Sequence, residues 1–354
     1  LRTLDLIRCD VLTGMPDLPD AQQRVVEALF PGAGSVALQR LHGGFSGALV
    51  VTARPAAPAG STSVVLKLDT DPRAIEEETE NMEKFAKLLG GNAPRLLRSV
   101  LQENAGGLVI ELCGAAWTVP GLDVQQNIRT FKDILGEGAD GRPLPVLHEV
   151  FGAIMPRLTL DGLAVESTAS LAAAYKLEAL VQKHVTDRKA TVARMLESWD
   201  DAHHDRGVFE RSAELALTTE QREAAGIGTI SDNETPAAFF ERLLPRVVAA
   251  LEAAPWARGT VHGDLNAANI LVDDEGICWV IDFAKSQAAG PAMMDLLKLE
   301  NTVLFEDTPL GEDGSDFAAA VRLTGALAGG FEPAAVQDLE LGEGGALARS
   351  WAVV

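Results

Sequence analysis

The sequence predicts an α+β protein with two lobes, a small strand-rich N-terminal lobe and a large, mainly helical C-terminal lobe. Short strand patterns and one helix pattern occupy residues 35–112, and helical periodicity dominates from about residue 121 onward. A β-hairpin pattern at 270–281 then interrupts the helical part. With 354 residues, 47% of them hydrophobic, the chain can build one large bilobal domain or two ordinary ones.

The N-terminal lobe is expected to follow a short lead-in at 1–30, which carries one helix at about 20–30. Strands are expected at 35–41 and 48–53, where apolar residues occur in short runs bounded by Gly and Pro. The segment VVLKL at 64–68 has the pattern of a short buried strand that contains one lysine.

A helix is expected at 72–89, because its apolar residues recur at helical spacing on one face, at Ile75, Met82, Phe85 and Leu89. Gly90 and Gly91 are expected to end this helix. Two strands are then expected at 96–101 and 108–112, joined by the turn ENAGG.

The C-terminal lobe contains a stretch at 170–199 without Gly or Pro, which predicts one helix or two, and a further helix pattern at 236–254. Two short strands are expected at 270–272 and 278–281, across the turn DDEG. We therefore expect a lead-in at 1–30, an N-lobe at 31–115 and a helical C-lobe at 116–354 that holds a catalytic loop at 261–283.

The formal net charge of −21 repels nucleic acid and anionic membrane surfaces unless a local basic patch overrides the net field, so neither is expected as a partner. The three cysteines, Cys9, Cys113 and Cys278, lie far apart and form no CxxC pair, which fits a reducing, cytoplasmic setting. No signal-peptide pattern and no apolar run of membrane-spanning length is visible.

The strongest chemical signal is VHGDLNAANILVDDEGICWVIDF at 261–283. It places Asp264, Asn269 and Asp282 at the ends of short strands, five and thirteen residues apart. Phosphoryl transfer needs a carboxylate that orients the attacking hydroxyl, and hard oxygen ligands for Mg²⁺. The alternative interpretation is a surface hairpin with incidental acidic residues.

These intervals resemble the catalytic loop and metal-binding aspartate of protein kinases, and the opening HGD resembles the aminoglycoside phosphotransferase and choline kinase branch. The resemblance implies that Asp264 is catalytic, that Asn269 and Asp282 ligate Mg²⁺, and that ATP supplies the phosphoryl group. It covers 35–115 and 255–305, whereas 121–255 matches nothing.

Lys67 lies within an apolar strand, where a lysine is costly to bury unless it is paired. In kinases the equivalent lysine holds the nucleotide phosphates and pairs with a glutamate of the next helix. We expect that partner to be Glu78, which shares the apolar helix face, with Glu77 and Glu80 as alternatives. The competing interpretation is an edge-strand lysine beside a solvated acidic helix.

The nucleotide is expected to contact two further segments. One is the turn that could cover the phosphates, formed by Gly43, Gly44, Phe45, Ser46 and Gly47, although it departs from GxGxxG and an ordinary turn is the alternative. The other follows the last strand of the N-lobe, where backbone near Glu111 and Cys113 is expected to bond to the adenine.

His262 is expected to brace the catalytic loop, with a role as general base as the alternative. Asp295, in GPAMMDLLKLE, matches an aspartate that the resemblance implies to support the same loop; a helix N-terminal acid is the alternative.

The run IDFAKSQAAGPAMMDLLKLENTVLF also resembles, more loosely, the kinase-like modules of bacterial conflict and signalling proteins called ternary-complex-associated domains. Two departures from ordinary protein kinases are Ala284 in place of the glycine of DFG, and the absence of an APE element.

The sequence thus predicts an ATP- and Mg²⁺-dependent phosphotransferase that acts on an unidentified hydroxyl-bearing acceptor, either a small molecule or a protein. The alternative is a nucleotide-binding regulator or scaffold module with partner domains in a larger system. A purely structural interaction protein would leave Lys67 and Asp264 unexplained.

Overall fold

The computed structural model describes residues 8–11, 18–41, 48–56, 62–113, 128–136, 143–166, 170–177, 245–252 and 255–305. The chain forms two compact units. The first comprises Leu1–Glu137, Gly141–Leu163 and Gly259–Val303, and the second comprises Gly138–Asp140, Ala164–Arg258 and Leu304–Val354. The lobe boundaries expected after residues 30 and 115 both fall inside the first unit and stay predictions.

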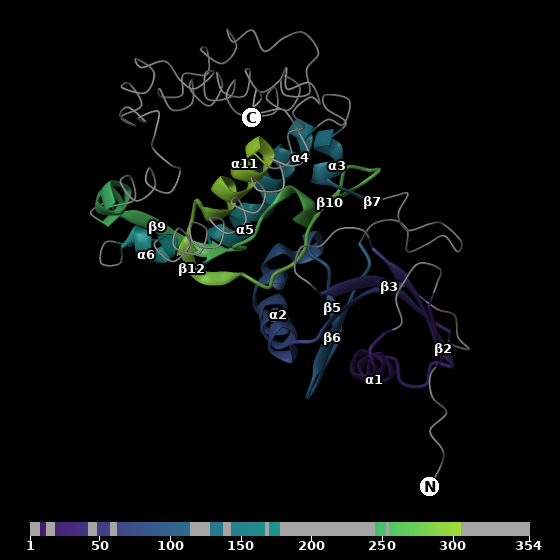
Figure 1. The fold of residues 1–354 in the computed structure, drawn as a ribbon. Helices are drawn as coiled ribbons and strands as arrows, with labels where there is room; N and C mark the ends of the chain where they lie inside the picture. The colour runs from purple at the N-terminus through teal and green to yellow at the C-terminus, as the bar shows by residue number, and fades with distance from the viewer. Residues whose placement is uncertain are drawn as a thin grey trace, which may run out of the picture. The chain divides into compact units, whose positions relative to one another are not determined.

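The N-terminal lobe is built on a six-stranded sheet with the order β1-β2-β3-β4-β6-β5 (Figure 1). Its strands are β1 (Arg8–Val11), β2 (Ser35–Arg40), β3 (Leu49–Pro55), β4 (Val64–Asp69), β5 (Leu96–Gln102) and β6 (Ala105–Ile110). All neighbours pair antiparallel except β1 and β2, which pair parallel. The lead-in therefore contributes a strand that no local pattern indicated.

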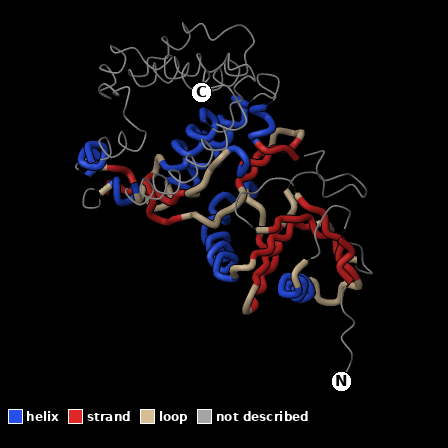
Figure 2. Tube along the Cα trace, viewed as in Figure 1, coloured by secondary structure: helices blue, strands red, loops and turns tan. Residues whose placement is uncertain are grey.

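Two helices, α1 (Asp20–Leu29) and α2 (Pro72–Phe85), pack against β6 (Figures 1 and 2). A Cβ on Gly107 would lie 2.7 Å from Val25 of α1, and one on Gly106 would lie 2.9 Å from the Cβ of Ile75 of α2. The two glycines thus allow the helices to approach this strand closely. The turn expected over ENAGG is wrong in its last residues, because strand β6 begins at Ala105.

Helix α2 begins at Pro72, where the side chain of Asp71 accepts a hydrogen bond from the backbone N–H of Arg73, as an N-cap does. Its buried residues recur at helical spacing, at Ile75, Glu78, Met82 and Phe85. The expected end at Gly90 is too late for the α-helix, which gives way at Ala86 to a 3-10 segment, η1 (Ala86–Asn92). Glu78 is therefore held on the buried face.

The main core of this lobe lies between α1 and the sheet. Its fully buried members include Val25, Val26, Val36 and Leu66. Each buried aliphatic side chain of this kind contributes roughly 1.5–3 kcal/mol. This core fixes β4, the strand that carries Lys67, in the middle of the sheet.

The C-terminal part of the first unit contains a second sheet, ordered β11-β10-β7. The expected hairpin is confirmed by the antiparallel pairing of β10 and β11, while strand β7, which completes the sheet, was not predicted. The elements of this part are β7 (Ile128–Thr130), α3 (Phe131–Gly136), α4 (Pro143–Glu149), η5 (Val150–Ile154), α5 (Met155–Thr159), η6 (Ala267–Asn269), β10 (Ile270–Asp273), β11 (Cys278–Val280), β12 (Gln287–Pro291) and α11 (Met294–Phe305).

In the second unit, the described residues include β8 (Ala164–Glu166), which pairs antiparallel with the start of β9 (Trp256–Val261). Of the long helix expected at 170–199, only 170–177 is described; there α6 (Leu171–Ala174) ends in a turn, and Lys176 has a φ of 51°. The remainder of that expectation lies outside the described residues. The described part of the helix expected at 236–254 is helical at 245–252.

None of the helices in the described part of the chain has the length and apolarity needed to cross a membrane.

Candidate active site

The loop after β9 carries the predicted catalytic residues and is shaped by its own side chains. The side chain of Asn266 accepts hydrogen bonds from the backbone N–H groups of Ala268 and Asn269, which starts the short helix η6. The amide nitrogen of Asn269 then donates to the backbone carbonyl of Asp264 over 2.8 Å. The loop is thereby closed on itself, with the side chain of Asn269 bonded to the backbone of Asp264.

His262 is fully buried and both of its ring nitrogens have partners. Its Nε2 lies 2.9 Å from the carbonyl oxygen of Ile281, and its Nδ1 lies 3.4 Å from the backbone nitrogen of Asp264. The consistent assignment is a neutral ring that donates from Nε2 and accepts at Nδ1. This arrangement supports the bracing role expected for His262 and leaves neither nitrogen for proton abstraction.

Helix α11 holds the same loop from the other side. The carboxylate of Asp295 accepts hydrogen bonds from the backbone nitrogens of His262 and Gly263, at 2.7 and 2.8 Å. Asp295 is only 2% exposed, and this burial raises the pKa of its carboxyl. The position and contacts of Asp295 agree with the supporting role that the resemblance implied.

Lys67, Glu78 and Asp282 meet in the first unit. The Nζ of Lys67 lies 2.6 Å from Oε2 of Glu78 and 3.4 Å from Oδ1 of Asp282. The side chains of Lys67 and Glu78 are 11% and 6% exposed. The expected pairing of Lys67 with Glu78 is therefore present, and it brings residues from β4, α2 and the loop after β11 together.

The electrostatics of this cluster follow from one ammonium between two carboxylates. Burial by itself lowers the pKa of Lys67, but the charges of Asp282 and Glu78 outweigh it, so the pKa lies above its ordinary value. Burial raises the pKa of Glu78, and the attraction of Lys67 offsets that only in part. The cluster thus holds one excess negative charge, which a bound cation would neutralise.

Asn269 and Asp282 have side-chain oxygen atoms of the kind that ligate Mg²⁺. The amide of Asn269 uses its nitrogen on Asp264, and within the described residues its Oδ1 has no hydrogen-bond donor. The backbone nitrogen of Ile281, the residue before Asp282, donates to the carbonyl of Asn269, so the two predicted ligands come from bonded segments. Asp282 itself has a left-handed φ of 66°, a conformation that costs free energy outside glycine.

The described residues contain no group of three or more His, Cys, Asp and Glu side chains suited to a metal ion. Mg²⁺ in phosphoryl-transfer sites commonly takes one or two protein oxygens and completes its shell with water and phosphate oxygens. Two protein ligands therefore fit a metal that arrives with a nucleotide, and the assignment of Asn269 and Asp282 stays a prediction.

Asp264, the predicted catalytic residue, lies between two lysines. Lys285 Nζ is 2.7 Å from its Oδ2, and Lys298 Nζ is 3.7 Å from its Oδ1. The side chain of Asp264 is 22% exposed, so solvent and solutes reach it. The sequence pattern did not anticipate either lysine.

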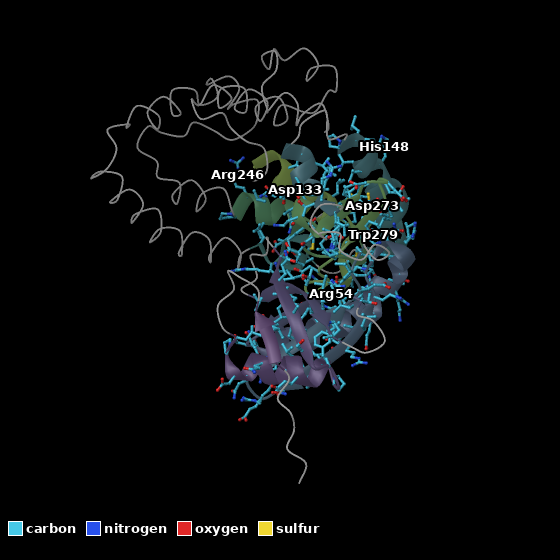
Figure 3. The ribbon with its side chains drawn as sticks, turned by 90° about the vertical axis from the view of Figure 1, so that its right-hand side faces the viewer. Arg54, Asp133, His148, Arg246, Asp273 and Trp279 are labelled. Carbon is cyan, nitrogen blue, oxygen red and sulfur yellow. The ribbon has the colours of Figure 1, made fainter. Side chains whose placement is uncertain are left out.

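The segment expected to contact adenine borders a cavity of about 570 Å³, lined among others by Leu112, Cys113 and Trp279 (Figure 3, which labels Trp279). The cavity wall also includes Glu111 and Arg95, whose side chains form a two-point ion pair. Its lining does not include Lys67, Glu78, Asp264 or Asp282.

The pKa values of the ionisable groups in this segment are shifted by their surroundings. Hydrogen bonds from Arg95 lower the pKa of Glu111, while burial raises the pKa of the Cys113 thiol to about 12. Cys113 is therefore a neutral thiol at physiological pH. The roles of Glu111 and Cys113 toward adenine stay predictions, and Gly43, Gly44, Phe45, Ser46 and Gly47 lie outside the described residues.

Sequence reasoning missed two polar side chains that shape the site. Asn81, one turn beyond Glu78 on α2, donates to the backbone carbonyl of Ala284 over 3.0 Å. Asn266 caps η6, and its position two residues before Ala268 in NAAN is a local signal that could have indicated this role. Nothing in the local pattern around Asn81 indicated its partner.

Taken together, the strand order, the Lys67–Glu78 pair and the contact of Lys67 with Asp282 define an α+β fold of the protein-kinase-like type, with a strand-rich N-lobe. Residues 163–354 match the family described as ternary complex associated domain 9. Because this match spans more than half of the chain, the chain belongs to that family. The looser of the two resemblances is thereby confirmed.

Solved structures similar to this chain include three phosphotransferases. An aminoglycoside-3′-phosphotransferase of type VIII is 17% identical with a TM-score of 0.39, covering 91% of this chain and 97% of its own. The choline kinase LicA from Streptococcus pneumoniae is 15% identical with a TM-score of 0.36, covering 94% and 98%. The macrolide 2′-phosphotransferase MphH from Brachybacterium faecium, as apoenzyme, is 16% identical with a TM-score of 0.36, covering 89% and 88%. A search of curated proteins gave no match.

Proposed function

We propose that this chain is an ATP- and Mg²⁺-dependent phosphotransferase that transfers the γ-phosphoryl group to a hydroxyl-bearing acceptor. The observation that carries the proposal is the buried Lys67 between Glu78 and Asp282, in the same unit as the solvent-accessible carboxylate of Asp264. A buried lysine with two acidic partners is costly to maintain for stability alone, and its geometry suits phosphate binding.

In the proposed reaction, the acceptor oxygen attacks the γ-phosphorus while the bond from that phosphorus to the β–γ bridging oxygen breaks, and ADP leaves with the electron pair. Asp264 orients the hydroxyl and takes its proton, which then passes to solvent. Lys67 holds the phosphates, and Glu78 holds Lys67. When bound at Asn269 and Asp282, Mg²⁺ would supply charge neutralisation on the phosphate oxygens.

The proposed setting is the cytoplasm, where thiols stay reduced; Cys113 and Cys278 are free and buried. A second candidate function is a nucleotide-binding regulator or scaffold within a multi-component assembly. This second candidate is favoured by the name of the family that matches residues 163–354, because that name refers to a ternary complex.

The test measures ATP turnover with Mg²⁺ and a panel of hydroxyl-bearing acceptors, in the wild type, in Asp264→Asn and in the control Asp274→Asn, an exposed acid of the hairpin turn. Asp264→Asn should lower turnover about a hundredfold or more, since an amide takes up no proton. Equal turnover in Asp264→Asn and wild type would remove Asp264 from the mechanism. Nucleotide binding without turnover in the wild type would favour the regulator.

A further inference from the structure

We propose that Lys285 and Lys298 form an anion-binding subsite beside Asp264, so that the preferred acceptor carries a phosphate or carboxylate near the hydroxyl that is phosphorylated. This inference rests on the proposed function, which left the acceptor unidentified, and it names the chemical class of that acceptor.

The first observation is that the carboxylate expected to take a proton is already occupied. Lys285 donates to Oδ2 of Asp264 over 2.7 Å, and Lys298 lies 3.7 Å from Oδ1. A carboxylate oxygen that accepts a charge-assisted hydrogen bond from lysine is less available to orient a neutral hydroxyl. Asp264 therefore cannot orient an acceptor hydroxyl through Oδ2 unless a ligand displaces Lys285.

The second observation is that the fold holds the Lys285 segment against the catalytic loop. Gly263 has a φ of 83°, and a Cβ at this position would overlap the backbone oxygen of Lys285. Next to Lys285, the hydroxyl of Ser286 donates to the backbone carbonyl of His262 over 3.1 Å and is buried. The backbone of Lys285 and the side chain of Ser286 thus lie against the residues just before Asp264.

The third observation is that Lys298 reaches the same carboxylate from an independent element. It lies on α11, one turn after Asp295, which holds the backbone of His262 and Gly263. The i and i+3 positions of a helix share a face, so bracing by Asp295 also presents Lys298 to the loop. Two elements therefore converge on Asp264 with cations.

Both ammonium groups remain accessible to a ligand. The side chains of Lys285 and Lys298 are 65% and 35% exposed, in contrast to the 11% exposure of Lys67. In a chain with 51 acidic and 30 basic residues, two accessible lysines on one carboxylate form a local site for an anion. An acceptor phosphate or carboxylate would draw Lys285 from Asp264 and free Oδ2 for the adjacent hydroxyl.

The mechanism makes a prediction that a simple structural ion pair does not. Lys285→Gln should raise the KM for an anionic acceptor about tenfold or more, the loss of one charge-assisted hydrogen bond. The same change should not raise the KM for a neutral acceptor, because Lys285 then no longer competes with the acceptor hydroxyl for Asp264. The ratio of kcat/KM for an anionic and a matched neutral acceptor should therefore fall.

The binding test uses inorganic phosphate, titrated calorimetrically into the full chain. All variants also carry Lys67→Met, which removes the cation expected to hold nucleotide phosphates. Phosphate bound at Lys67 therefore cannot be mistaken for phosphate bound at Lys285 and Lys298. On that background, Lys285→Gln combined with Lys298→Gln should weaken phosphate binding at least about tenfold. The control Lys87→Gln, an exposed lysine of η1, should not. Equal affinity in all variants, or no phosphate binding, would overturn the subsite.

The kinetic test compares glycerol with glycerol 3-phosphate as acceptors, in wild type, Lys285→Gln and Lys285→Arg. The proposal expects a preference for glycerol 3-phosphate that Lys285→Gln reduces and Lys285→Arg largely restores. Parallel loss with both acceptors would show a structural role only and contradict it. ATP turnover that depends on Asp264 but ignores both lysines would leave the proposed function standing and the subsite rejected. Phosphate binding that depends on the two lysines, without any ATP turnover, would support the anion-binding subsite and contradict the proposed function.

Discussion

Lys67 shows most directly how a single residue ties this fold to its chemistry. Its ammonium is bonded to Glu78 and to Asp282, and the shift of its pKa shows that these charges outweigh the cost of burial. For Glu78, by contrast, burial raises the pKa, and the attraction of Lys67 offsets this only in part. Because buried ion pairs contribute little to stability on balance, the burial of this cluster supports the proposed role of Lys67 in phosphate binding.

We expect Lys67→Met to keep the fold and to lower turnover about a hundredfold or more, as removal of one preorganised charge-stabilising group does. The affinity for ATP should fall much less, because the interaction strengthens as charge shifts on the phosphates in the transition state. Turnover and nucleotide affinity are measured on the same protein, with circular dichroism as the folding check.

The matched control for this prediction is Lys87→Met, which removes an exposed lysine from η1 and should change neither quantity. If Lys67→Met turns over ATP as fast as the wild type, Lys67 has no part in catalysis. If the affinity for ATP falls while kcat stays at the wild-type value, the contribution of Lys67 is to ground-state binding alone.

At the scale of elements, the site is held by polar contacts that connect helices to loops. Asn81 of α2 donates to Ala284 behind Asp282, and Asn92 at the end of η1 donates to the carbonyl of Cys278 in β11 over 2.9 Å. Arg157 of α5 donates to Asn92 and to the carbonyl of Leu89. These contacts fix α2, and with it Glu78, against the hairpin that carries Asp282.

The contact of α11 with the catalytic loop gives a test at this scale. Asp295→Asn should destabilise the protein by about 2–4 kcal/mol, because one of two buried backbone N–H groups would face an amide N–H₂ in place of an acceptor. Asp274→Asn, on the exposed hairpin turn, should stay within about 0.5 kcal/mol of wild type. Urea unfolding of the three proteins measures the difference.

An Asp295→Asn protein as stable as the wild type would show that the two hydrogen bonds to His262 and Gly263 do not hold the loop. Loss of stability in the Asp274→Asn control would show instead that the effect is not specific to α11.

The molecule as a whole carries a formal net charge of −21, which includes one excess negative charge from the cluster of Lys67, Glu78 and Asp282 at the expected phosphate site. A nucleotide triphosphate is itself strongly anionic. Binding should therefore depend on a divalent cation that offsets both sets of charges.

We accordingly expect ATP with Mg²⁺ to raise the melting temperature, by mass action on the native state, with about 2.7 kcal/mol of stabilisation at a hundredfold excess over Kd. ATP with EDTA, and Mg²⁺ alone, should have a much smaller effect. Differential scanning fluorimetry measures the shift, and titration calorimetry gives the Kd. The absence of binding at millimolar nucleotide with Mg²⁺ would contradict the nucleotide site.

Much of the fold was predictable because its signals are local. The helix that carries Glu78 is amphipathic, the hairpin at 270–281 is marked by its turn, and Lys67 stands out in an apolar strand. The elements that were missed, such as β1 and β7, are three or four residues long and are defined by partners distant in sequence. The turn at ENAGG was misjudged because glycine there serves helix packing on both faces of β6.

By itself, the sequence predicted the α+β organisation and the pairing of Lys67 with Glu78, because strand and helix periodicity are local, and the structure contains both. The roles of Asp264, Asn269 and Asp282 follow from their intervals and stay predictions. Only the tertiary structure decided that Lys285 and Lys298 converge on Asp264, and that Asn81 bonds to Ala284. Those contacts join residues from separate elements, up to 203 positions apart for Asn81 and Ala284. No short-range pattern reports such a partner, since the packing of whole elements brings the side chains together.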